Sequence, residues 1–231
     1  MLIEQPSAGP RDQYASLKYV APFALFLLFL ALSPRLPIDP FWEAPLRVAA
    51  LAVVCTLCWP RELRLRPARW LASVGIGAVV FALWIAPDLL IPGYRSLPLF
   101  SNAVVGHAHS SLGDAALHSR WILAWRTARA VLIVPVVEEL FWRAWLMRWL
   151  INTDFRKIPL GTYAPLSFWL TAILFASEHG PYWDVGLVTG VIYNWWMIRT
   201  KSVADCILMH AVTNGLLSAY VIAAGQWQYW Q

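Results

Sequence analysis

Seven stretches of the sequence are apolar over lengths close to those needed to cross a lipid bilayer. They cover residues 19–33, 41–59, 70–92, 121–150, 165–177, 183–198 and 203–224. A spanning helix needs about 20 residues, so the short runs must borrow flanking residues, and the long fourth run must tilt, project or kink at Pro135. The pattern predicts an all-α fold, a polytopic transmembrane helical bundle of seven spans, or eight if residues 99–117 also enter the membrane.

Composition also indicates a membrane protein. Hydrophobic residues make up 59% of the chain and charged residues 13%, whereas an ordinary soluble domain is about 25% charged. We expect a polar segment over residues 1–18 and a single integral-membrane domain over residues 19–231, with a motif-bearing core at about 121–224. The polar segment does not resemble a cleavable signal peptide, so the first apolar run is expected to remain as a span.

Basic residues gather in short loops between the apolar runs. The most basic loop is RELRLRPAR at residues 61–69, and FRK at 155–157 and RTK at 199–201 are shorter examples. With seven spans and a cytoplasmic N-terminus, all three loops fall on the cytoplasmic side, as the positive-inside rule requires. The pI of 9.3 is thereby explained by topology, so we expect the lipid bilayer as partner and no nucleic acid.

Two residue pairs suggest a metal site, and both are better explained without one. Cys55 and Cys58 form a CxxC inside an apolar run, where a thiol is a small packed side chain rather than an accessible ligand. His107 and His109 lie in the long polar connection at residues 95–120, and two histidines in a loop are a weak match. We expect no metal and no other cofactor.

Ionisable side chains inside apolar helices are the strongest functional signal, because each costs roughly 2.5–3.5 kcal/mol at mid-helix unless it pairs or lines a wet cavity. Glu139 and Arg143 are four residues apart, so they share a helix face and are expected to form an ion pair. Glu138 points about 100° away from its neighbour on a helix of 3.6 residues per turn. Glu138 therefore needs a partner from elsewhere in the fold.

Two further helices offer polar groups at helical spacing. His210 and Asn214 are four residues apart, as are Phe175 and His179. If Glu138 meets these groups at one point, the carboxylate can take a proton from water while hydrogen-bond donors stabilise an oxyanion at a carbonyl. The same residues would also be explained as satisfied interhelical hydrogen bonds, which hold many membrane bundles together.

These residues form three motifs in order. EELFWR contains EExxxR, FASEH contains FxxxH and HAVTN contains HxxxN. In this order, inside apolar helices, they resemble the CAAX-protease and bacteriocin-processing family (CPBP, or Abi) of glutamic intramembrane proteases over about residues 129–217. The short spans and the closing GQWQYW also resemble a bacterial subgroup that accompanies exosortase systems, which implies a bacterial inner membrane.

The resemblance implies a metal-independent intramembrane endopeptidase that hydrolyses a peptide bond of a membrane-associated or lipid-modified protein. Glu138 would activate water with the help of His179, and His210 and Asn214 would form the oxyanion site. Structural support of the site would come from Glu139, Arg143 and Phe175. The alternatives are a non-proteolytic immunity or assembly factor of the same fold, which binds a partner, and a small transporter with a protonatable Glu138.

Overall fold

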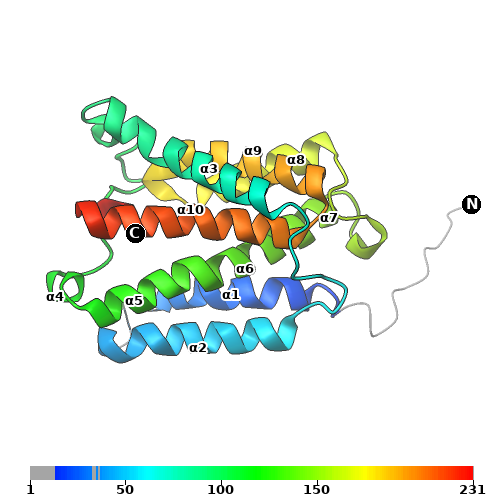
Figure 1. The fold of residues 1–231 in the computed structure, drawn as a ribbon, viewed down its shortest axis with the longest axis horizontal. Coiled ribbons are helices and arrows are strands. Elements are labelled where there is room, and N and C mark those ends of the chain that lie inside the picture. The colour runs from blue at the N-terminus through cyan, green and yellow to red at the C-terminus, as the bar shows by residue number, and fades with distance from the viewer. Residues whose placement is uncertain (1–13, 33–34, 36, 231) are drawn as a thin grey trace, which may run out of the picture.

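The structure is a computed structural model that describes residues 14–32, 35 and 37–230. Residues 1–13 of the polar N-terminal segment therefore lie outside the described part of the chain. The described residues form helices joined by loops and contain no β-strand (Figure 1). The all-α fold expected from the apolar runs is confirmed.

Each predicted apolar run corresponds to a helical segment whose ends lie within two residues of the prediction. The first three are α1 (Leu17–Leu32), α2 (Pro40–Cys58) and α3 (Trp70–Leu90). The fourth is one continuous helix composed of α5 (Arg120–Ala128), η3 (Arg129–Ile133), α6 (Val134–Glu139), η4 (Leu140–Leu146) and α7 (Met147–Trp149). The last three are α8 (Pro165–Ser177), α9 (Trp183–Thr200) and α10 (Val203–Ala224).

Helices α2, α3 and α10 are each long and apolar enough to cross a bilayer, and α1 and α8 are shorter apolar helices. The connection from α3 to α5, residues 91–119, contains only the short turns η2 (Tyr94–Ser96) and α4 (Asp114–Leu117). An eighth helix of spanning length therefore does not form there.

Helix α10 occupies the centre of the bundle (Figure 1). It packs along α3 on one side and against η3 and α6 on the other, while α8 packs along α9 and α1 along α2. Gly77 permits the close approach of α3 and α10, because a Cβ at this position would lie 2.5 Å from the carbonyl oxygen of Met209. The central position of α10 carries its polar side chains to the helix that bears the two glutamates.

The fourth helix departs from α-helical geometry in two places. Its segments η3 and η4 are π-helical, whereas the spacing arguments above assumed 3.6 residues per turn throughout. The first departure lies just before Pro135, which has no backbone N–H and disrupts the α-helical ladder. There the N–H of Val134 bonds to the carbonyl of Arg129, five residues back. Such π-turns are frequent at functional sites.

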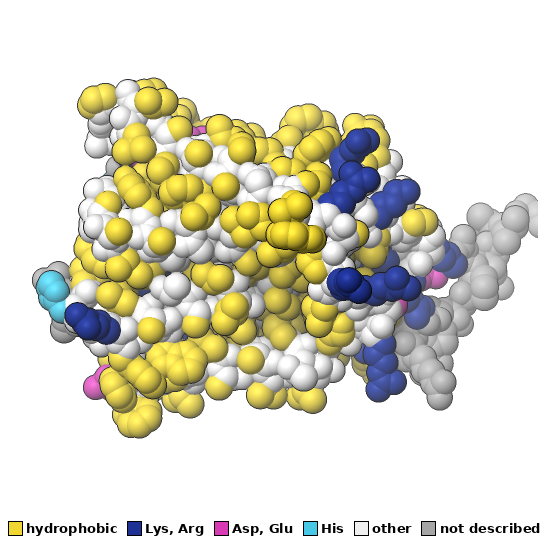
Figure 2. All heavy atoms as spheres, viewed as in Figure 1, with side chains coloured by type: hydrophobic (Ala, Val, Ile, Leu, Met, Phe, Trp, Pro, Cys, Tyr) yellow, Lys and Arg dark blue, Asp and Glu magenta, His cyan; other side chains and the backbone are white. Residues whose placement is uncertain are grey.

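Hydrophobic side chains are spread over the lateral face shown in Figure 2, and most of the lysines and arginines visible there gather at one end of the bundle. The loops that join α2 to α3, α7 to α8 and α9 to α10 lie at this end (Figure 1). Their basic side chains are exposed at residues 61–69, 156–157, 199 and 201. An apolar belt with one basic end is the pattern of an integral membrane protein.

Candidate active site

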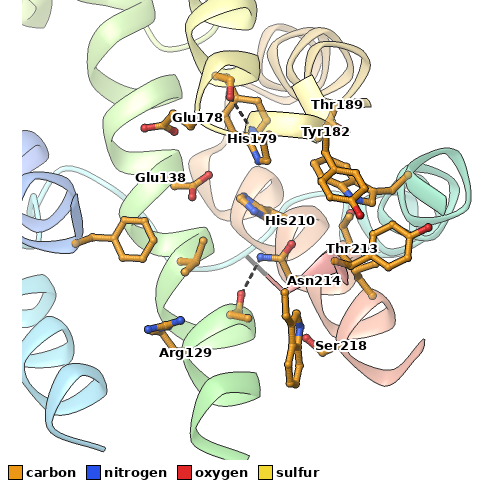
Figure 3. A pocket seen from close by; sticks show the side chains of 18 of the residues that line it. Arg129, Glu138, Glu178, His179, Tyr182, Thr189, His210, Thr213, Asn214 and Ser218 are labelled. Atoms are coloured by element: carbon orange, nitrogen blue, oxygen red, sulfur yellow. Dashed lines mark hydrogen bonds between the residues drawn. The ribbon is translucent and has the colours of Figure 1, made fainter. Parts of the chain in front are cut away.

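A cavity of about 380 Å³ lies between α1, the fourth helix, α3, α9 and α10. The predicted residues Glu138, His179, His210 and Asn214 all line it, as Figure 3 shows. Helix α8 has 13 residues and is thus about 20 Å long, less than the roughly 30 Å of a bilayer core. Because α8 is short, the turn that follows it brings His179 to the depth of Glu138.

The carboxylate of Glu138 is enclosed and has no hydrogen-bond or ion-pair partner among the described residues. The residue is 7% exposed. Among the residues that the structure describes, nothing hydrogen-bonds to its buried Oε2 atom. Burial of an unpaired carboxylate is expensive, so folding stability does not explain why a glutamate stands at this position.

The neighbouring Glu139 has two partners, both at its Oε1 atom, while its buried Oε2 atom has no hydrogen-bond partner among the described residues. Its Oε1 atom accepts from Arg143 Nη1 at 3.0 Å, and both side chains are fully buried, so the predicted ion pair is confirmed. The same oxygen lies 2.9 Å from His210 Nδ1. Arg143 in turn donates from Nε to Asn194 Oδ1 at 3.2 Å, and its guanidinium lies 4.3 Å from the centre of the Phe175 ring.

Hydrogen bonds determine how each imidazole faces the cavity. His179 Nδ1 lies 2.8 Å from the carbonyl oxygen of Phe175. A carbonyl only accepts, so Nδ1 carries the proton and Nε2 is an acceptor in the neutral ring. His210 Nδ1 likewise donates to the Glu139 carboxylate, so its Nε2 becomes a donor only in the imidazolium form.

Asn214 is positioned by the irregular segment around Pro135. Because Val134 bonds to Arg129 instead, the carbonyl of Ala130 loses its α-helical donor, and Pro135 supplies none in the π register. Asn214 Nδ2 donates to this carbonyl at 2.8 Å, the bond drawn in Figure 3. The second amide N–H and Oδ1 of Asn214 remain for a ligand in the cavity.

The turn that carries His179 is held by its surroundings. A Cβ on Gly186 would lie 3.2 Å from His179 Cγ and Nδ1, so α9 packs directly against the imidazole. The ring centre of Trp84 lies 5.2 Å from that of His179. Two residues further on, the carbonyl of Pro181 accepts from Arg95 Nη1 at 2.7 Å. The position of His179 therefore depends on α3, α9 and the α3–α5 connection.

Several cavity residues were not identified from the sequence. Glu178 was not assigned to the site from its sequence position, yet its side chain lines the cavity beside Glu138 (Figure 3). Ser218 also lines the cavity, and its buried hydroxyl lacks a partner among the described residues. Further polar residues in the lining are Arg126, Arg129, Thr189, Tyr193 and Thr213. Arg126 and Arg129 could have been identified from the sequence, because each is a charged residue in an apolar helix.

The two residue pairs considered as metal ligands gain no third ligand from the described part of the chain. In the described part of the chain, no three His, Cys, Asp or Glu side chains are grouped as a metal site would require. Cys55 and Cys58 are free thiols, and Cys55 is buried. His109 Nδ1 lies 2.8 Å from the carbonyl oxygen of His107 in the exposed connection after α3.

Residues 120–216 match the family model of type II CAAX prenyl endopeptidases, Rce1-like. The chain carries an Rce1-like domain. The match runs from the start of α5 into α10 and includes all three motifs, so the resemblance to the CAAX-protease family is confirmed. Neither the comparison with curated proteins nor that with solved structures returned a match.

The Rce1-like family is a family of proteases, which supports a CAAX-type intramembrane endopeptidase at the level of the family. Helices α1, α2 and α3 precede the matched residues. Nevertheless, Phe26 and Leu30 of α1 and Trp84 of α3 line the cavity of the Rce1-like domain. The enclosed volume is thus completed by residues outside the matched segment.

Proposed function

We propose that this protein is an intramembrane endopeptidase that hydrolyses a peptide bond of a membrane-associated or lipid-modified protein with a water activated by Glu138. The observation that carries the proposal is the Glu138 carboxylate, which makes no hydrogen bond or ion pair with a described residue and shares a cavity with His179, His210 and Asn214. A carboxylate that no protein group satisfies is available to accept a proton from water.

In the proposed reaction, a water molecule lies between Glu138 and Nε2 of His179. Glu138 takes one proton, and the oxygen forms a bond to the carbonyl carbon of the substrate. The carbonyl electron pair moves to its oxygen. When the tetrahedral species collapses, the C–N bond breaks and the proton held by Glu138 passes to the departing amine. Proton transfer of this kind contributes typically about 10²–10⁴-fold to the rate.

Asn214 and His210 are proposed to stabilise the oxyanion. Asn214 has one amide N–H left after its bond to Ala130. His210 can donate from Nε2 only as an imidazolium, and the adjacent carboxylate of Glu139 would balance that charge. Arg143 holds Glu139 in place through their buried ion pair. Loss of one oxyanion donor lowers turnover by about 10²–10³-fold in well-studied hydrolases.

The orientation in the membrane follows from the basic end of the bundle. We place the loops at residues 61–69, 155–157 and 199–201 in the cytoplasm of a bacterium, with the N-terminus on the same side. Fusion of a reporter to the loop at residues 155–157 should give cytoplasmic activity. A periplasmic signal would contradict this orientation.

A comparison of membrane peptides from three strains tests the function. The strains express the parent protein, Glu138→Gln, or Asp154→Asn as a control for a carboxylate outside the cavity, with equal protein levels verified. A membrane peptide should accumulate uncut only in the Glu138→Gln strain. A protein that acts by binding a partner would tolerate this substitution, and normal processing in that strain would refute the protease.

Purified protein can then be tested for its metal requirement. Cleavage of the identified peptide should persist in the presence of a chelator, because a carboxylate and an imidazole suffice to activate water in the proposed reaction. Loss of cleavage on chelation, with recovery on addition of zinc, would instead assign a metalloenzyme.

A further inference from the structure

A second carboxylate lines the cavity beside Glu138. Glu178 follows the last residue of α8 and directly precedes His179. Its side chain lines the cavity (Figure 3), but the residue is exposed, whereas Glu138 is buried. Glu178 therefore lies at the rim of the cavity, and Glu138 lies in its interior.

The structure supplies no paired countercharge for Glu178. No ion pair joins its carboxylate to a described residue. The indole of Trp142 is near and contributes only a neutral N–H, and Arg143 is already ion-paired with Glu139. A carboxylate at the end of an apolar membrane helix is costly, and examples without a partner mark sites for ions or substrates.

The two arginines of the cavity lie away from Glu178. Arg126 on α5 and Arg129 on η3 line this cavity and also a second cavity of about 380 Å³ next to α2. Figure 3 shows Arg129 on the other side of Glu138 from Glu178. The cavity thus has a basic end and an acidic end.

Glu138 and Glu178 act on each other electrostatically. Two carboxylates that share an apolar site repel each other, and a low dielectric makes the repulsion strong. A cation bound at Glu178 would offset this repulsion and form charge-assisted hydrogen bonds.

The state of Glu138 points independently to a ligand at this end of the cavity. Its side chain is 7% exposed, faces the cavity, and has a buried Oε2 atom without a partner among the described residues. A ligand with a cationic group at Glu178 therefore also lies against the proposed base.

We infer that Glu178 forms a subsite for the side chain of a lysine or arginine in the substrate, close to the scissile bond. An extended peptide advances about 3.3 Å per residue, so a cationic residue at Glu178, beside Glu138, is about one or two residues from the bond that is cut. The inference rests on the proposed protease function, because the scissile bond is placed at Glu138. Glu178 is thus a specificity residue that selects a basic substrate sequence.

The test uses three N-dodecanoyl pentapeptide amides of alanine and leucine whose central residue is lysine, norleucine or glutamate. Affinity is measured from thermal stabilisation in neutral detergent, in a Glu138→Gln background that prevents cleavage. The lysine peptide should bind about tenfold more tightly than the norleucine peptide, because ionised partners strengthen hydrogen bonds. Glu178→Gln should bring the lysine-to-norleucine ratio close to one.

Two further variants sharpen the result. Glu178→Asp should keep part of the preference, since it retains the charge on a shorter side chain, and Glu178→Lys should favour the glutamate peptide. Asp154→Asn is the matched control, because it removes a carboxylate outside the cavity and should leave the ratio unchanged. Equal affinity for the lysine and norleucine peptides, or an unchanged ratio in Glu178→Gln, would overturn the subsite.

Two other roles for Glu178 give different results. Stabilisation by phosphatidylethanolamine that depends on Glu178, without a preference for lysine, would assign the carboxylate to a lipid ammonium group and refute the peptide subsite. With Glu138 intact, an equal loss of turnover on the lysine and norleucine peptides in Glu178→Gln would assign Glu178 to proton transfer, which also refutes the subsite. Glu178-dependent binding of lysine by a protein that cuts no peptide would retain the subsite while removing the protease.

Discussion

Two adjacent glutamates on one helix have opposite environments. Glu139 is fully buried and bonded to Arg143 and His210, and Asn194 and Phe175 complete the shell around Arg143. Glu138 faces a cavity, and no hydrogen bond or ion pair joins its side chain to a described residue. The buried Oε2 atom lacks a hydrogen-bond partner among the described residues in both glutamates, so the difference lies at Oε1. Glu139 belongs to the packed core of the bundle, and Glu138 faces the cavity.

The difference separates two uses of buried charge. An ion-paired carboxylate such as that of Glu139 holds its neighbours in place, because breaking the pair leaves an uncompensated charge. A carboxylate whose hydrogen bonds are not made retains the capacity to bind water or a substrate. The contrast predicts that variants of the two glutamates lose different properties.

The largest effect is expected for Glu138→Gln. Turnover should fall about 10²–10⁴-fold, because the amide keeps the shape of the side chain but is not a base. The melting temperature should stay the same or rise, since burial of an amide is less expensive than burial of an unpaired carboxylate. The measurements are peptide cleavage and thermal unfolding in detergent. Early melting of this variant, together with normal melting of Glu139→Gln, would reverse the two assignments.

The next largest effect is expected in the folding stability of variants that break the ion pair between Glu139 and Arg143. Arg143→Ala should destabilise the protein by about 3–5 kcal/mol, because it leaves the fully buried Glu139 without its main countercharge. The double variant Glu139→Gln with Arg143→Met should recover part of this loss but not full turnover, since His210 loses its charged partner. Arg199→Ala, at an exposed arginine, serves as the control and should stay within about 0.5 kcal/mol. Wild-type stability of Arg143→Ala would show that the ion pair does not support the fold.

The smallest effect is expected for Gly186→Ala, which tests how precisely His179 must be positioned in the cavity. A Cβ on Gly186 would lie 3.2 Å from the ring of His179, so Gly186→Ala should shift the imidazole by a few tenths of an ångström. Turnover should fall roughly several-fold, since even a displacement of about 1 Å can cost 100-fold, while stability changes little. Gly75→Ala is the matched control, because a Cβ there would contact nothing within 4 Å. Equal turnover in both variants would mean that His179 tolerates displacement.

The amino-acid sequence by itself determined the helices and the pairing within a helix. The apolar runs predicted all seven helical segments within two residues of their ends, because hydrophobic length depends only on contiguous residues. The spacing of Glu139 and Arg143 predicted their ion pair for the same reason, since residues four apart on a helix are neighbours whatever surrounds them. The order of the three motifs was enough to predict the family.

Only the tertiary structure decided what the remaining polar groups contact. His210 bonds to Glu139 across 71 positions of the sequence, and Asn214 bonds to a carbonyl that Pro135 leaves without a helical donor. Neither contact follows from a 3.6-residue period, because one depends on the packing of α10 and the other on a local π-turn. The location of Arg126 and Arg129 in the lining of two cavities likewise follows only from the packing of the helices. Helix packing brings distant residues together, and hydropathy along the chain does not specify which helix faces pack against each other.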